Sequence, residues 1–140
     1  NNKTLRTENI SKIASKIATI KKVREFINIQ QKIIVKKELK KRGCVIDGRD
    51  IGSVVFKNAS LKIFVKVNEK IRAKRRHKQL NDIGEKSIYA KILKEIKLRD
   101  KKDKSRKNSP LVIPRGAHII DNSGNFQNTV KQINKIIKIK

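Results

Sequence analysis

The first third of the chain carries apolar residues at helical spacing. The pattern predicts an amphipathic helix from Thr7 to about Ile20, whose apolar face is formed by Ile10, Ile13, Ala14 and Ile17. A second helical pattern follows Lys21 and Lys22, with the apolar positions Val23, Phe26, Ile27, Ile33 and Ile34. Segment 36–43 is strongly basic and ends in a glycine, so it is expected to be a charged loop.

Short runs of β-branched and aromatic residues predict strands at 44–46, 61–67 and 117–121. Between and after them lie helical patterns. Asn68 is expected to cap a helix that runs to about Asp82, and Ser87 to cap the next. The last helix has the apolar positions Val130, Ile133, Ile136 and Ile137. This alternation predicts an α/β fold with a parallel sheet flanked by helices, in which 101–109 is the most loop-like segment.

Charge at first favours a nucleic-acid-binding protein, since the 140 residues have a net charge of +26. The basic residues, however, are 28 Lys and only 10 Arg, and Lys, Ile and Asn, which all have A/T-rich codons, are frequent throughout. Five aromatic residues and no recognisable binding motif argue against a specific nucleic-acid complex. We therefore expect only non-specific, salt-sensitive binding of polyanions.

Other features restrict the setting of the protein. No apolar run approaches the roughly 20 residues of a membrane span, and the N-terminus has no apolar signal region. The single Cys44 excludes an internal disulfide and a Cys-based zinc site, and it is expected to be a small core residue. These features predict a cytoplasmic protein that does not bind membranes. Because the sequence contains no Met, we expect it to begin inside a longer protein.

The first candidate site is the segment 47–53, which contains Asp47, Arg49 and Asp50 after the first predicted strand. Ligands of parallel sheets bind beyond the carboxyl ends of the strands. Arg49 can bind a phosphate with two prongs, and Asp50 can accept hydrogen bonds from an amino group or a sugar hydroxyl. The alternative is a turn closed by an internal salt bridge.

The second candidate site combines Arg99, Asp103 and Arg106, which share one face if the segment is helical. Two guanidinium groups around one carboxylate suit a phosphate; a solvated helix with ordinary ion pairs is the alternative. A third group, Arg72, Arg75 and Arg76, is either a nucleotide contact or a basic outer face. Ser15 and Arg24 carry no signal by themselves.

Together these motifs resemble the bacterial cytidylate kinase family over nearly the whole chain. Residues 44–65, CVIDGRDIGSVVFKNASLKIFV, match a strand followed by D-G-R-D-x-G-T-V-V-F and then K-I-F-L, with Ser53 in place of Thr. Residues 96–112, IKLRDKKDKSRKNSPLV, match I-x-x-R-D-x-x-D-x-x-R followed by S-P-L. Residues 5–24 resemble the family in an R-T opening, an A-S pair and a later V-R.

The resemblance implies a P-loop nucleoside monophosphate kinase, a transferase of pyrimidine metabolism that moves the γ-phosphoryl group of ATP to CMP or dCMP with Mg²⁺. It implies that CMP is bound by Ser15, Arg24, Asp47, Arg49 and Asp50. It places Arg99, Asp103 and Arg106 in a mobile, catalytic lid, and Arg75 and Arg76 on the ATP side. A monomer is expected. A basic nucleic-acid-binding protein and a non-catalytic nucleotide-binding remnant are the alternatives.

One family element is missing. No G-x-x-x-x-G-K-S/T sequence, the loop that cradles the ATP phosphates, occurs in the 140 residues. We therefore expect a C-terminal portion of the kinase that lacks the first strand and the P-loop and is inactive alone. It is expected to divide into a helical monophosphate-binding part (1–35), core strands and a helix (44–85), a lid (86–112), and a last strand with a C-terminal helix (113–140).

Overall fold

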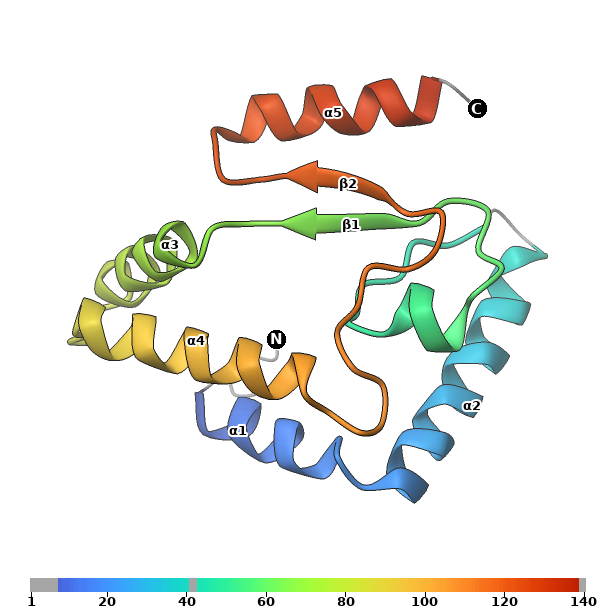
Figure 1. The fold of residues 1–140 in the computed structure, drawn as a ribbon, viewed down its shortest axis with the longest axis horizontal. Helices are drawn as coiled ribbons and strands as arrows, with labels where there is room; N and C mark the ends of the chain where they lie inside the picture. The colour runs from blue at the N-terminus through green and yellow to red at the C-terminus, as the bar shows by residue number, and fades with distance from the viewer. Residues whose placement is uncertain (1–7, 41–42, 139–140) are drawn as a thin grey trace.

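The computed structural model of the chain describes residues 8–40 and 43–138 (Figure 1). Its elements in chain order are α1 (Glu8–Ile17), α2 (Lys21–Leu39), the single π-helical turn η2 (Ile51–Val55), β1 (Ile63–Lys66), α3 (Glu69–Asp82), α4 (Tyr89–Lys104), β2 (His118–Asp121) and α5 (Phe126–Lys138). The predicted start of the first helix at Thr7 lies outside the described residues, and its predicted end is three residues too late, because α1 stops at Ile17.

Within the described residues the sheet consists of β1 and β2, which run parallel with Ile63 opposite His118 and Lys66 opposite Asp121. The helices α3 and α4 form the crossover between these strands, and α5 packs beside β2 (Figure 1). The predicted α/β class with a parallel sheet flanked by helices is confirmed.

The predicted strand at 44–46 is wrong for this structure. The segment has no regular secondary structure, and Val45 is fully exposed. Apolar β-branched residues form a strand only where a neighbouring strand receives their backbone hydrogen bonds, and no described segment pairs with this one. Cys44, expected in the core, is exposed for the same reason.

Both polar segments that were expected to be loops begin as helix. Residues 36–39 form the end of α2 and residues 101–104 the end of α4. Lysines favour the last turn of a helix, where they interact with its dipole and the unpaired carbonyls. Gly43, at a φ of 79°, adopts the left-handed conformation that favours glycine. Residues 41 and 42 of the predicted basic loop lie outside the described residues.

The two predicted helix caps have different outcomes. Asn68 caps α3 as expected, with its Oδ1 accepting a hydrogen bond from the backbone N–H of Lys70 at 2.8 Å. Ser87 does not cap α4, which begins at Tyr89 after Ile88. The Ser87 hydroxyl instead lies 2.7 Å from Nδ1 of His77 in α3. That contact links the two helices at the turn between them.

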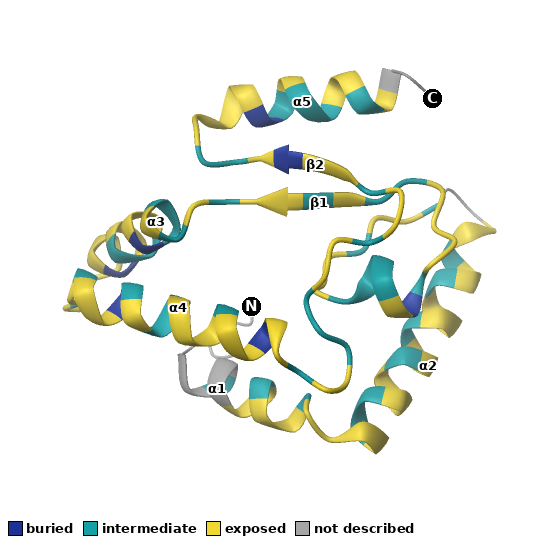
Figure 2. Ribbon diagram, viewed as in Figure 1, coloured by how far each residue is buried: buried dark blue, intermediate teal, exposed yellow. Residues whose placement is uncertain are grey.

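Buried side chains concentrate on the α3–α4 pair and the sheet (Figure 2). Ala73, Leu80 and Ile92 form a buried apolar cluster, against which Tyr89, Leu93 and Ile96 pack. Ile120 of β2 and Val55 of η2 are buried elsewhere. The helix α2, all of whose residues are described, buries no side chain. The core of this chain therefore lies at one end, and α1 and α2 extend from it.

Candidate functional site

The centre of the candidate site is Asp103, which is 1% exposed near the end of α4. Its Oδ2 pairs with Nη1 of Arg49, and its Oδ1 lies 2.5 Å from Nη2 of Arg106. A buried carboxylate is stable only when opposite charges and hydrogen bonds compensate its lost hydration. The two guanidinium groups supply that compensation. This ion-pair cluster of Arg49, Asp103 and Arg106 joins the loop after residue 47, the end of α4 and the segment that follows α4.

Arg106 reaches the cluster from beyond the helix. The prediction that Arg99, Asp103 and Arg106 share one helical face is wrong for Arg106, because α4 ends at Lys104. The chain turns back there, and the backbone N–H of Leu111 donates to the carbonyl of Asp103 at 2.8 Å. This turn points Arg106 at Asp103 and also places its Nη2 3.5 Å from the hydroxyl of Ser15 in α1.

A second ion pair joins α2 to the loop that contains Arg49. Nη1 of Arg24 donates to Oδ2 of Asp50, and the two side chains are 15% and 13% exposed. Nε of Arg24 donates to the carbonyl of Ala18, just after α1, at 3.1 Å. Arg24 therefore holds the α1–α2 corner against Asp50, while the neighbouring Arg49 holds the same loop against α4.

Arg99 adds a further positive charge to the cluster. Partial burial lowers the pKa of its guanidinium, the charge of Arg49 lowers it further, and Asp103 partly opposes both effects. The group remains protonated at any physiological pH, because arginine ionises far above neutrality. Two guanidinium groups therefore pair with one carboxylate while a third interacts with it electrostatically, and the excess of positive charge favours an anionic ligand such as a phosphate.

The structure thus brings together seven of the residues singled out from sequence: Ser15, Arg24, Arg49, Asp50, Arg99, Asp103 and Arg106. Asp47 is exposed and makes no ion pair with the described residues. Arg75 and Arg76 contact other groups: Arg75 donates to the carbonyl of Gly124 at 2.9 Å, and Arg76 to Oε1 of Gln79 at 2.9 Å.

One ion pair near the cluster was not anticipated. Arg72 in α3 binds Asp100 in α4 with two prongs, Nη1 to Oδ1 at 2.9 Å and Nη2 to Oδ2. The hydrogen bond from Arg72 lowers the pKa of Asp100, and the same bond raises the pKa of Arg72. The two residues are 28 positions apart in the chain, so no local spacing could have indicated the pair. Only the antiparallel packing of α3 on α4 brings them together.

The described residues do not provide a metal centre. They contain no cluster of three or more His, Cys, Asp or Glu side chains able to hold an ion. The sequence also has no phosphate-cradling G-x-x-x-x-G-K-S/T loop. The residues present therefore do not fit a complete site for ATP and Mg²⁺.

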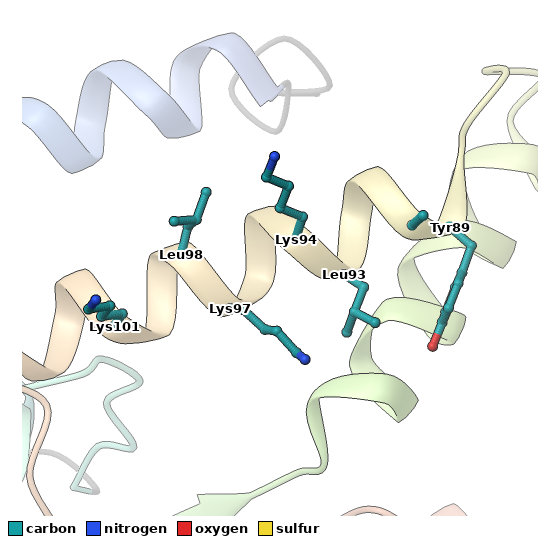
Figure 3. Close-up of a pocket in the computed structure, with 7 residues that line it drawn as sticks. Tyr89, Leu93, Lys94, Lys97, Leu98 and Lys101 are labelled. Carbon is teal, nitrogen blue, oxygen red and sulfur yellow. The ribbon is translucent and has the colours of Figure 1, made fainter.

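A shallow groove of about 440 Å³ runs along α4 but contains none of the predicted site residues. It has an apolar floor and a rim of lysines, formed by Tyr89, Ala90, Leu93, Lys94, Lys97, Leu98 and Lys101. Figure 3 shows that Lys94 and Leu98 point toward α1, whereas Leu93 and Tyr89 point toward α3. The groove and the ion-pair cluster thus share no residue, although both involve α4.

Among the described residues, no helix is both long enough and apolar enough to cross a membrane.

Comparison with known proteins agrees with the sequence motifs. The family model described as "Cytidylate kinase" matches residues 1–139. The chain is 44% identical over 141 aligned residues to "Cytidylate kinase" of Rickettsia rickettsii (strain Sheila Smith), and the match covers 100% of this chain and 63% of the relative. It is 47% identical over 123 residues to "Cytidylate kinase" of Rickettsia canadensis (strain McKiel), covering 88% of this chain and 55% of the relative.

The chain thus spans somewhat less than two thirds of the length of these relatives. The match nevertheless extends over nearly every residue of this chain, including the three motif segments and the residues of the ion-pair cluster. This chain belongs to the cytidylate kinase family.

Proposed function

We propose that this chain forms the CMP-binding part of a cytidylate kinase, which transfers the γ-phosphoryl group of ATP to CMP or dCMP and produces CDP or dCDP. The observation that carries the proposal is the convergence of Arg49 and Arg106 on the buried Asp103. Arg99, which interacts electrostatically with Arg49 and Asp103, adds further positive charge beside that carboxylate. Family membership supports the same reading.

Each residue of the cluster has a role that its chemistry allows. Arg49 binds the CMP phosphate with two prongs, and Arg99 and Arg106 neutralise the charge that develops on the transferring group. Asp103 keeps the arginines in place before the ligand arrives, so little reorganisation is needed on binding. A lid formed by segment 86–112 excludes water, which would otherwise accept the phosphoryl group.

The cytosine base is proposed to bind near the ion pair between Arg24 and Asp50. Arg24 engages Oδ2 of Asp50, and Oδ1 of Asp50 has no hydrogen bond with the described residues. That free oxygen can accept a hydrogen bond from the cytosine amino group, and Ser15 and Asp47 can complete the polar surround. A base without the amino group leaves this oxygen unpaired, which disfavours its binding.

The phosphoryl donor is proposed to be ATP with Mg²⁺, with Arg75 and Arg76 on the ATP side. Phosphoryl transfer requires the attacking and leaving oxygens to lie in line at the γ-phosphorus, and Mg²⁺ would neutralise negative charge on the phosphate oxygens. Because the 140 residues contain no P-loop sequence, we propose that they bind CMP without turning over ATP.

Calorimetry with CMP, cytidine and UMP tests the acceptor site. We expect CMP to bind more tightly than cytidine, since only CMP has the phosphate. Replacing Arg49 with lysine should weaken CMP binding about tenfold or more, because lysine keeps the charge but cannot form two parallel hydrogen bonds. Arg115→Lys, at an exposed arginine outside the cluster, is the matched control and should bind like the wild type.

Two outcomes would contradict the proposal. Equal affinity for CMP and cytidine would show that the arginines do not bind the phosphate. Tight binding of RNA or DNA that survives moderate salt, with Arg49→Lys unaffected, would favour the alternative that the net charge of +26 raises. Non-specific binding, by contrast, should disappear steeply as salt is added.

A further inference from the structure

The two halves of α4 are fastened to α3 by different forces. The first half, up to Ile96, packs through the apolar cluster around Ala73, Leu80 and Ile92. Beyond Ile96, two ion pairs join the helices: Lys97 with Glu69, and Arg72 with Asp100. The cluster residues Arg99, Asp103 and Arg106 all lie in or after this second half. Polar contacts therefore hold the part of α4 that carries the site.

These two ion pairs differ in how strongly they restrain the helix. The Lys97–Glu69 pair is 3.8 Å long, and its side chains are 56% and 45% exposed. Such a pair contributes little, because water screens it and long side chains must be ordered to form it. The Arg72–Asp100 pair is shorter, less exposed and two-pronged. A planar fork on a carboxylate fixes orientation as well as distance.

Asp100 lies where a small displacement would matter. It follows Arg99 directly and precedes Asp103 by three residues, about 4.5 Å along a helix axis. A shift of α4 at Asp100 would therefore move Asp103, and with it the carboxylate that aligns Arg49 and Arg106. Neither Arg72 nor Asp100 forms a hydrogen bond or an ion pair with the members of the cluster.

The other side of the pair is anchored to the sheet. The backbone N–H of Asn68, which caps α3, donates to the hydroxyl of Ser123 after β2 at 2.9 Å. One turn beyond Arg72, Nη2 of Arg75 donates to the carbonyl of Gly124 in the same turn. The first two turns of α3 are thus tied to the carboxyl end of the sheet (Figure 1). The ion pair between Arg72 and Asp100 connects this anchored part of α3 to α4.

We propose that Arg72 and Asp100 form a clamp that holds the second half of α4 against the sheet-anchored α3, so that the Asp103 carboxylate keeps Arg49 in the position that binds the CMP phosphate. The inference rests on the proposed CMP-binding function. Both are positioning residues, since they act through the cluster and do not touch CMP.

The test compares CMP with cytidine in the full chain by calorimetry. Asp100→Asn should weaken CMP about tenfold, within the range of coupling between neighbouring residues, and should leave cytidine nearly unchanged. Arg72→Lys keeps the positive charge but cannot form two parallel hydrogen bonds to Asp100. It should therefore weaken CMP binding less than Asp100→Asn does. The double variant Arg72→Asp/Asp100→Arg should recover most of the preference for CMP. Glu85→Gln, at an exposed carboxylate between α3 and α4, is the control and should match the wild type.

Several results would overturn the clamp. Unchanged CMP affinity in Asp100→Asn would do so, and so would an equal loss for CMP and cytidine, which indicates a general structural role. A double variant that restores nothing would indicate that one residue contacts CMP itself. Circular dichroism checks that each variant folds. If Asp100→Asn does not fold, the CMP affinity of Arg72→Lys tests the clamp instead. A wild-type chain with no preference for CMP over cytidine overturns the proposed function and the clamp together.

Discussion

The two ends of the molecule are held together in contrasting ways. Apart from Val55 of η2, the buried apolar side chains of the described residues lie in the α3–α4 pair and the sheet, among them Ala73, Ile92 and Ile120. The α1–α2 end has strongly apolar helical faces, yet α2 buries none of its side chains, and Phe26 and Ile34 are 59% and 60% exposed. Figure 2 shows the same division along the chain.

The contrast shows that the candidate site is made by polar contacts between a packed part and an open part. Ser15 and Arg24 belong to the open part, whereas Asp103 and Arg106 belong to or follow the packed α4. The loop with Arg49 and Asp50 contacts both. Ion pairs and hydrogen bonds are directional, so they can define the relative position of α1, α2 and α4 without a shared apolar core.

The largest effect is expected from Asp103→Ala, which removes the central link between the two parts. Arg49 and Arg106 then face each other without a counter-charge, and the free energy of unfolding should fall by about 3 kcal/mol. Urea denaturation measures this change. Asp82→Ala, at an exposed carboxylate, is the control and should change little. Equal stabilities of the two variants would mean that the cluster does not connect the parts.

A matched pair of apolar truncations compares the two parts directly. Ile92→Ala opens a cavity in the α3–α4 core and should cost about 2.5 kcal/mol. Ile29→Ala, on α2 where the side chain is 56% exposed, should cost less than about 0.5 kcal/mol. Thermal or urea denaturation measures both variants. Similar losses would show that the face of α2 is covered in solution and that the contrast is incorrect.

A smaller and more local effect is expected from Asp50→Asn, which weakens the pair with Arg24. Loss of one charge-assisted hydrogen bond should destabilise the α1–α2 corner by about 1.5 kcal/mol. Hydrogen exchange should therefore speed up in α1 and α2 but not in the α3–α4 core. Glu25→Gln affects only the exposed 3.8 Å pair with Lys21 and should leave exchange unchanged. Uniform acceleration in both parts would contradict the division.

The smallest effect concerns pH and the packed part alone. The pKa of Asp100 lies below its ordinary value of 3.8, chiefly because of the hydrogen bond from Arg72. The ionised pair therefore contributes stability above pH 3.8, and the contribution is lost as the pH falls through the lowered pKa. The stability difference between the wild type and Asp100→Asn should shrink over that range. A difference that stays constant as the pH falls from neutrality to about 2 would argue against the pair.

Local patterns predicted the elements that depend on short-range physics. The helices around Ile13, Leu80 and Ile133 follow from apolar residues at helical spacing, and β1 and β2 follow from runs of β-branched residues. The cap at Asn68 also depends on neighbouring atoms only. The strand at 44–46 was wrong because strand formation requires a partner outside the segment, which no local pattern supplies.

The candidate site follows the same rule. The motifs identified Arg49, Asp103 and Arg106 as chemically interesting, but they could not show that Asp103 is buried between the two arginines, 54 positions from Arg49 in the chain. Ser87 was expected to cap a helix, yet its hydroxyl faces His77 across the turn. Such partners are set by how α3, α4 and the loop pack, which is tertiary information.

The exposed Cys44 has a practical consequence. It is the only cysteine in the 140 residues, and its side chain is accessible, so a maleimide dye would attach at one defined position without prior mutagenesis. The label would stand five residues before Arg49, on the loop that contacts both parts of the molecule. Its fluorescence would then report, in real time and at low protein concentration, how that loop responds when a nucleotide is added.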